Sequence, residues 1–318
     1  MPNTGGEKMK QTYIGGQAVM EGVMMRGKKI YTVAVRKPDQ KIIMDKQPVR
    51  TIANRYPIFK LPILRGILAF MESMVVGMKT LTYSASFFEE EEVQSSKMDS
   101  WLEKKLGDRF ENFMIGFTVV VAILLAIGLF MVAPLLLTGL IHKWVPTGRF
   151  RSLIEGVIRI LIFLLYILLI SRMKDIQRVF QYHGAEHKTI HCYEHGKELT
   201  VENARTQSRL HKRCGTSFLL FVMLVSIFVF MFIDIENMWL RLFSRIALVP
   251  FIAGLSYEII RLAGRSDSFL VRLISYPGMG LQLLTTAEPD DEQLAVAICA
   301  MQGVLDEEGD GDDAGKNP

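Results

Sequence analysis

Four of the chain's six histidines lie in one short stretch, YHGAEHKTIHCYEHG, and each follows the previous one by four residues. On an α-helix this spacing places side chains on adjacent turns of one face, where two neighbouring imidazoles can bind one metal ion. Each step of four residues also advances about 40° around the helix axis, so the two ends of the row diverge. We therefore expect two of the histidines, or three at most, to share an ion. The four are His183, His187, His191 and His195.

The first pair fits a catalytic metal site best, because His183 and His187 enclose Glu186 in the sequence HGAEH. This is an instance of H-x-x-E-H, in which two histidines hold zinc and the glutamate acts as general base. A metal lowers the pKa of a bound water to about 7, so that a nearby carboxylate can accept its proton. In a helix Glu186 is rotated by about 100° from His187, at the edge of the ligand shell.

Further ligands follow in RLHKRCGTS, where His211 and Cys214 precede an apolar stretch. A set of three histidines and one cysteine suits zinc, and one position can be yielded to water. Cys192 is another candidate, although it directly follows His191 and so should point to a different face. We predict metal ligands at His183, His187, His211 and Cys214, and we expect His191 and His195 to be solvated or peripheral.

Two interpretations without a metal stay open for this segment. A solvated amphipathic linker would also carry titratable histidines, and the basic residues beside them could bind anionic lipid headgroups. The residues after the histidines suit an ordinary turn and a short helix, with Gly196 ending one helix and Thr200 capping the next.

The glycine- and methionine-rich stretch IGGQAVMEGVMMRG (Ile14–Gly27) is the other dense motif. Its glycines allow tight turns and close backbone approach, but it lacks the Gly-Lys-Ser/Thr of a phosphate-binding loop. Glu21 and Arg26 are its only charges. Spacing alone favours a packed turn with methionine side chains filling gaps over a contribution of Glu21 or Arg26 to the histidine site.

Composition predicts a membrane protein, since 50% of the 318 residues are hydrophobic and the mean hydropathy is +0.24. A span needs about 20 apolar residues, and four stretches qualify or nearly qualify. The net charge of +4 is too mild to indicate a nucleic-acid binder. Three cysteines do not form a disulfide framework and favour a reducing compartment. The four predicted spans are residues 114–141 (with Pro134 as a possible kink), 153–170, 216–233 and 245–264.

Polar residues within these spans need partners, because charge at membrane depth is costly. Glu155 and Arg159 lie four residues apart and could form a pair. Glu258 should face other helices or an aqueous cavity.

The distribution of basic residues predicts the orientation. Residues 171–215 contain nine Lys or Arg, whereas residues 142–152 and 234–246 contain three and two. Cytoplasmic loops carry the excess of positive charge. The histidine segment and both termini are therefore predicted to be cytoplasmic, in a multi-pass protein of a bacterial plasma membrane.

The remaining segments give a domain outline of 1–60, 61–113, 114–264, 265–304 and 305–318. In the first, Ile30–Val49 reads as two strands around a turn at KPDQ. In the second, Arg65, Glu72 and Lys79 form one polar stripe seven residues apart on an apolar helix over 61–88. We expect this amphipathic helix to lie in the membrane interface, and a buried or re-entrant helix is the alternative.

The last two segments are predicted to be a cytoplasmic helical region and a disordered tail. PGMGLQLL reads as a turn followed by an apolar segment, and PDDEQ reads as a helix start with Thr286 or Glu288 as the cap. The acidic, glycine-rich tail from residue 305 is expected to be disordered.

The motifs GGQAVMEGVMMRG, GAEHKTI, RCGTSFLL and EPDDEQL resemble the bacterial YqhQ family, over residues of about 14 to 301. That family is uncharacterised, and its members are described as metal-dependent multi-pass membrane proteins. The resemblance implies that His183, Glu186, His187, His211 and Cys214 lie in shared motifs. It also gives Glu21 and Arg26 more weight than spacing does, and implies that His191, His195 and Cys192 lie outside the pattern.

We therefore predict a mainly α membrane protein of about four transmembrane helices. It has a small N-terminal β element, an interfacial amphipathic helix and a cytoplasmic segment that carries the His/Cys metal site. The preferred function is a zinc-dependent hydrolase, with Glu186 activating water and Arg26 or Lys188 orienting a substrate group.

Two other functions remain as alternatives. The first is a membrane scaffold or membrane-protein assembly factor with a structural metal. The second is a transporter, which is less favoured because the sequence has no internal repeat. The lipid bilayer and other membrane proteins are the expected partners, and no nucleic acid is expected.

Overall fold

The computed structural model describes residues 12–88, 110–144, 150–212, 214–233, 235, 237–263 and 269–308. The chain divides into two compact units. The first contains residues 1–88, 167–221 and 253–318, and the second contains residues 89–166 and 222–252. All of the predicted site residues belong to the first unit.

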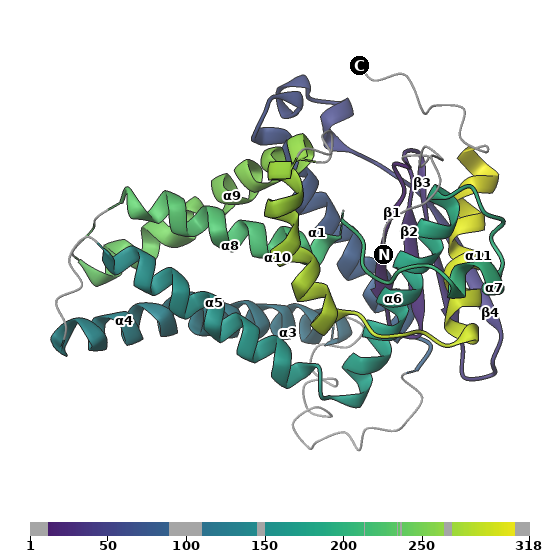
Figure 1. The fold of residues 1–318 in the computed structure, drawn as a ribbon, viewed down its shortest axis with the longest axis horizontal. Coiled ribbons are helices and arrows are strands. Elements are labelled where there is room, and N and C mark those ends of the chain that lie inside the picture. Colours follow the sequence, from purple (N-terminus) through teal and green to yellow (C-terminus); the bar gives the residue numbers. More distant parts are fainter. Residues whose placement is uncertain are drawn as a thin grey trace. The chain divides into compact units, whose positions relative to one another are not determined.

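The first unit contains an antiparallel sheet of four strands in sequential order: β1 (Gly15–Val19), β2 (Gly22–Arg26), β3 (Ile30–Arg36) and β4 (Ile42–Pro48) (Figure 1). The two strands predicted around KPDQ are β3 and β4, so this prediction is confirmed. The packed turn expected over Ile14–Gly27 is instead the β1–β2 hairpin. Its turn contains Glu21 with a φ of 48°.

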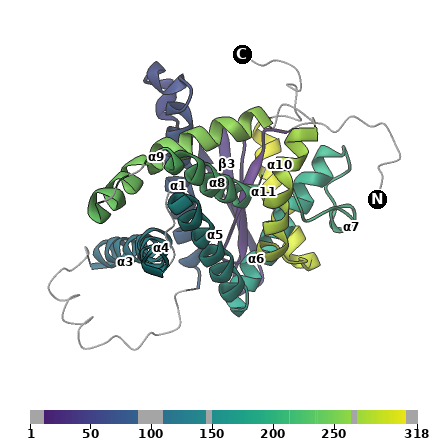
Figure 2. The same cartoon turned by 60° about the vertical axis from the view of Figure 1, so that its left-hand side comes forward.

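Both faces of the sheet are covered, which explains why this hairpin lacks the alternation of a half-buried strand. Val23 and Met25 of β2 pack with α6 (Lys174–Glu194) and α11 (Asp291–Glu308). Met24 packs on the opposite face with residues of α1 (Leu64–Ala85). The two views agree that α6 and α11 lie beside the sheet (Figure 2). A strand buried on both faces reads as a continuous apolar run.

Helix α6 carries the histidine row and ends where the sequence predicts. Gly196 has a φ of 65°, as expected after a helix C-terminus. Thr200 caps the short helix α7 (Val201–Arg205) by accepting a hydrogen bond from the backbone of Asn203 at 3.2 Å.

The predicted polar stripe of α1 pairs with other parts of the first unit. Arg65 donates to the carboxylate of Glu258 at 2.6 Å, which confirms that Glu258 faces another helix. Glu72 accepts from the backbone of Ile52 in the 3₁₀ turn Ile52–Asn54 and lies 3.7 Å from Arg26. A second 3₁₀ turn, Pro57–Lys60, precedes the helix. The interfacial position of this helix stays a prediction.

Helix α10 (Phe269–Thr285) continues without interruption across PGMG, so the turn predicted there is wrong. Pro277 is accommodated inside the helix, and the glycine after it serves close packing. A β-carbon on Gly278 would lie 2.7 Å from the hydroxyl of Ser217 in α8 (Gly215–Met231). Gln282 also donates to that hydroxyl at 3.0 Å.

The helix start predicted at PDDEQ is confirmed, but its cap is Asp290 rather than Thr286 or Glu288. Asp290 accepts from the backbone of Gln293 at 2.8 Å, and the Gln293 side chain accepts from the backbone of Asp290 at 3.0 Å. This reciprocal pair is a capping box. Helix α11 continues to Glu308, which accepts from the backbone of Lys29 at 2.6 Å. The disorder predicted from residue 305 is therefore wrong for residues 305–308, and the rest of the predicted tail lies outside the described residues.

Among the described residues, three helical segments are long and apolar enough to cross a membrane, by length and composition. The first joins α3 (Phe110–Ile127) and α4 (Ala133–Trp144) through a π-helical turn at Gly128–Val132, just before Pro134. The others are α5 (Arg151–Ile170) and α9 (Met238–Ala263). The remaining predicted span, residues 216–233, corresponds to α8, an apolar helix of 17 residues. The expected number of four spans therefore stays a prediction.

The second unit buries an ion-pair network between α5 and α9. Arg159 donates to Glu155 at 3.0 Å, as the spacing of these residues predicts, and Arg245 donates to the other oxygen of Glu155 at 3.0 Å. Arg159 also donates to the backbone carbonyl of Phe130 in the π-helical turn, at 3.0 Å. The network therefore satisfies one carbonyl of that turn.

Candidate metal centre

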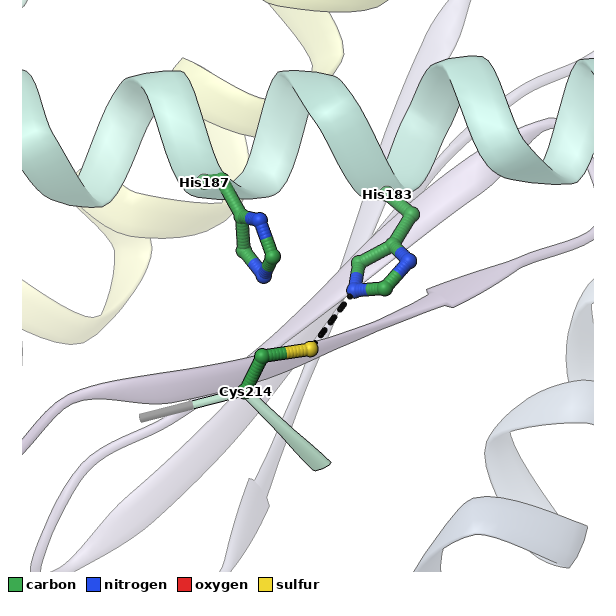
Figure 3. Close-up of side chains that lie close together, drawn as sticks. All are labelled: His183, His187 and Cys214. Atoms are coloured by element: carbon green, nitrogen blue, oxygen red, sulfur yellow. Dashed lines mark hydrogen bonds between the residues drawn. The ribbon is translucent and has the colours of Figure 1, made fainter. Parts of the chain in front are cut away.

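His183, His187 and Cys214 come together on one side of α6 (Figure 3). Each offers one ligand atom, and these atoms all lie within 4.8 Å of one another. The Nε2 atom of His183 is 3.1 Å from the sulfur of Cys214, and the two imidazole centroids are 4.5 Å apart. Three of the four predicted ligands are thus close enough to share one ion.

Backbone carbonyls fix the orientation of both imidazoles. His183 Nδ1 lies 2.8 Å from the carbonyl oxygen of Thr285, and His187 Nδ1 lies 2.6 Å from that of Arg209. A carbonyl oxygen only accepts, so Nδ1 is the protonated atom of each ring. Both rings then present a lone pair at Nε2 toward Cys214. Histidine ligands in metal sites are commonly held by such second hydrogen bonds.

Close packing around α6 positions the carbonyl of Thr285. The backbone of Ala287 donates to the carbonyl of Phe180 at 2.8 Å. A β-carbon on Gly184 would lie 2.1 Å from the carbonyl oxygen of Ala287, so only glycine allows this approach. The Arg209 side chain in turn donates to the carbonyl of Thr286. The segments that carry the two accepting carbonyls, those of Arg209 and Thr285, are therefore linked to each other.

Electrostatics also favour a metal over protons at this site. Burial lowers the pKa of His187 and keeps its imidazole neutral. Its buried Nε2 has no hydrogen-bond partner of acceptable geometry among the described residues. Burial raises the pKa of the Cys214 thiol, but His187 and Thr216 outweigh burial, so the pKa is lowered overall. A neutral imidazole with an unsatisfied nitrogen beside a thiol of lowered pKa fits zinc.

Glu186 is buried against β1, beside the candidate ligands. A β-carbon on Gly16 would lie 2.8 Å from its side chain, so this glycine makes room for the carboxyl group. Burial raises the pKa of Glu186 to about 8, although the neighbouring His183 and a hydrogen bond from the backbone of Gly16 act to lower it. Such a strongly shifted acid beside a metal-ligand cluster is typical of a functional site.

A cavity of about 920 Å³ adjoins the cluster. His183, Glu186, His187 and Cys214 line it together with strand β1, and Arg26 lies in its wall. A cavity of this size is in the range that binds small molecules. The cluster therefore borders a space large enough for a substrate.

His211, the fourth predicted ligand, also lines the cavity but belongs to a neighbouring group. Its Nε2 lies 3.2 Å from Glu194, and its ring centroid is 4.7 Å from that of His191 and 5.7 Å from that of His187. His191 is half-buried, with its Nε2 2.9 Å from the carbonyl oxygen of Leu210, and it lies outside the first group. His195 is exposed.

Glu21 and Lys188 do not line the cavity. Glu21 forms an ion pair with Arg178 and accepts from the Tyr182 hydroxyl at 3.2 Å. Lys188 is buried, donates to the carbonyl of Arg205 at 2.8 Å and forms an ion pair with Glu288. Among the three site-shaping candidates, the cavity therefore includes only Arg26.

Cys192, predicted to face elsewhere, lies 3.3 Å from the Glu198 carbonyl and is buried away from the cavity.

Sequence reasoning missed residues that shape the site through their backbone or by being small. Gly16 and Gly184 make room, and the carbonyls of Arg209 and Thr285 orient the imidazoles. The glycines within quoted motifs were the only available signal, because a carbonyl oxygen is common to every residue type.

Comparison with known proteins gives two matches. A family model described as "Protein of unknown function (DUF1385)" matches residues 61–307. The chain is 39% identical over 292 residues to "Uncharacterized protein YqhQ" of Bacillus subtilis (strain 168), covering 92% of each chain. No solved structure matches.

Proposed function

Because the chain belongs to the family described as "Protein of unknown function (DUF1385)", a description that names no reaction, we propose its function from the site: a membrane-associated, zinc-dependent hydrolase. The sequence resemblance to the YqhQ family is confirmed by the same comparison. The observation that supports the proposal is a three-ligand cluster beside a cavity whose wall includes a buried glutamate.

The number of ligands supports catalysis rather than structure. Structural zinc sites are closed by four protein ligands, whereas catalytic sites keep three and leave one position open. His183, His187 and Cys214 form a group of three that borders the cavity. A zinc ion bound there would supply Lewis acidity toward a water molecule or a substrate carbonyl oxygen.

In this proposal, Glu186, Arg26 and two backbone carbonyls each have one role in the reaction. Glu186 accepts a proton from the attacking water and transfers it to the leaving group. Arg26, which lines the cavity and lies 3.7 Å from Glu72, orients an anionic or carbonyl group of the substrate. The carbonyls of Thr285 and Arg209 keep both imidazoles in the tautomer that the reaction requires.

Metal content tests the ligand assignment. Purified wild-type protein should contain zinc, as measured by inductively coupled plasma mass spectrometry. His187→Ala should lose the zinc of this site. The exposed His195, which directly follows the same helix, provides the control, and His195→Ala should retain the zinc. Equal metal in wild type and His187→Ala would refute the assignment.

An open ligand position can be tested before a substrate is known. We expect a hydroxamate to change the visible spectrum of cobalt-substituted protein, because the free position accepts an added ligand. Glu186→Gln should keep the metal and this spectral response, yet fail to complement deletion of the gene. A spectrum that hydroxamate does not change, together with full complementation by Glu186→Gln, would refute catalysis.

A scaffold or assembly factor with a structural metal is the second candidate, and the surface of α1 supports it. Its exposed side chains include Met71, Met74, Val75 and Met78. Flexible methionine side chains suit adaptable contacts with other proteins, although the same surface suits the predicted membrane interface. A cobalt spectrum that hydroxamate does not change, together with full complementation by Glu186→Gln, would favour this candidate.

A further inference from the structure

The histidine helix carries a second group of metal-ligand type, one turn beyond the first. His191 and Glu194 are three residues apart on α6, a spacing that places both on one face. His211 joins them from the segment before α8. The three ligand atoms lie within 4.8 Å of one another, and Glu194 and His211 are both buried.

A backbone carbonyl also orients His191, although through the other ring nitrogen. Its Nε2 lies 2.9 Å from the carbonyl oxygen of Leu210 and must donate to it. In the neutral ring Nδ1 then carries the lone pair. The backbone of His211 is also held, because its N–H donates to Gln282 at 2.8 Å and its carbonyl accepts from Gln282 at 2.8 Å. Such outer hydrogen bonds are typical of histidine ligands.

We propose that His191, Glu194 and His211 bind a second divalent metal ion, beside the ion held by His183, His187 and Cys214. The centroids of His187 and His211, one from each group, are 5.7 Å apart, and both residues line the same cavity. The helix thus carries two adjacent metal sites rather than one four-ligand site. This inference goes beyond the proposed hydrolase and does not depend on it.

The donor atoms make the two sites chemically different. The first group offers two nitrogens and a sulfur, which favour zinc and other soft metals. The second offers two nitrogens and a carboxylate oxygen, which accept zinc, manganese, iron or cobalt. Zinc fits both sites, and the thiolate distinguishes the first from the second by spectroscopy.

The competing explanation is a buried hydrogen bond between His211 and Glu194, whose atoms lie 3.2 Å apart. Such a pair satisfies a buried carboxylate without any metal. This hydrogen bond involves only two residues, however, and does not explain why His191 is also present. The ring centroids of His191 and His211 lie 4.7 Å apart. Counting bound ions distinguishes the two explanations.

The experiment measures zinc in the purified full-length chain after equilibration with zinc and desalting. Wild type should hold about two ions per chain, and both Glu194→Gln and His191→Ala should hold about one. His195→Ala is the matched control and should hold as many as wild type. Glu194→Gln keeps the size of the side chain, so it preserves the fold if His191→Ala does not.

Cobalt substitution shows which ion is lost, because a thiolate-to-cobalt charge-transfer band arises only at Cys214. Glu194→Gln should keep this band at full intensity, whereas Cys214→Ala should lose the band and keep about one cobalt ion. Suppose that wild type holds one ion, that Glu194→Gln keeps it and that Cys214→Ala loses it. This result would overturn the second site and leave the proposed function intact. One ion that only the His191 and Glu194 variants remove would overturn the first site instead. Protein without metal would overturn both.

Discussion

The carbonyl oxygen of Ala287 lies only 2.1 Å from the position that a β-carbon on Gly184 would take. This approach brings the chain after α10 against the histidine helix, two residues beyond the carbonyl of Thr285 that orients His183. The geometry of the first candidate metal group therefore depends on a residue that has no side chain and lies next to His183, one of the proposed ligands.

Gly184→Ala is expected to destabilise the protein by about 1–3 kcal/mol, because the added methyl group forces the backbone of Ala287 to move. Thermal unfolding in detergent measures the effect, and zinc content should fall with it as the carbonyl of Thr285 shifts. Gly280→Ala is the control, since a β-carbon there meets no atom within 4 Å. A Gly184→Ala protein as stable as wild type would contradict the contact.

Cys214 should be the most reactive thiol after removal of metal by a chelator. Its pKa is lowered, whereas burial raises the pKa of Cys192 and of Cys299. Only the thiolate is nucleophilic, so alkylation of Cys214 should begin at lower pH than alkylation of the other two. Peptide mass spectrometry after timed iodoacetamide treatment measures the order, and added zinc should protect Cys214.

The same shift predicts how stability changes with pH. When the pKa of a thiol is lower in the folded than in the unfolded chain, the unfolded chain binds more protons between the two values. The contribution of Cys214 is therefore present above the ordinary thiol pKa and lost as pH falls through the lowered one. Metal-free wild type and Cys214→Ser should thus differ more in stability at alkaline than at neutral pH. A constant difference would contradict the lowered pKa.

Lys188→Met should reduce stability and leave metal content unchanged. The ammonium group is buried and donates to the carbonyl of Arg205, and loss of a buried charged hydrogen bond costs about 1.5–3 kcal/mol. Chemical denaturation and metal analysis of the same preparation measure both quantities. Loss of metal without loss of stability would instead assign Lys188 to the site, as the sequence suggested.

Glu155→Gln should destabilise the second unit by about 3–5 kcal/mol, because it leaves Arg159 and Arg245 buried without their shared anion. Asp291→Asn is the contrasting variant, since its ion pair with Arg205 is exposed and such pairs contribute little. Unfolding in detergent compares the two. Similar stability of both variants would show that the buried network does not stabilise the unit.

The sequence predicts structure correctly where residue types repeat at a regular spacing within one segment. The four-residue spacing of His183 and His187 places them on one helix face without reference to any other segment, and the alternation around KPDQ identifies β3 and β4. Strand β2 was missed because burial on both faces removes that alternation. The position of His211 depends on how the chain folds back after α7, so its place beside Glu194 rather than His183 could not be predicted from spacing.

The carbonyls that hold the imidazoles have a consequence for how the protein is made. A ribosome synthesises Gly16 first, then α6, then Cys214, and only after these the segment of Thr285. The first group therefore cannot reach its final geometry until Thr285, at the end of α10, has been translated and lies beside His183. A chain that stops before Thr285 contains His183, His187 and Cys214 but lacks the contact that orients His183. If the proposed site binds zinc, tight binding would therefore require that translation has passed α10.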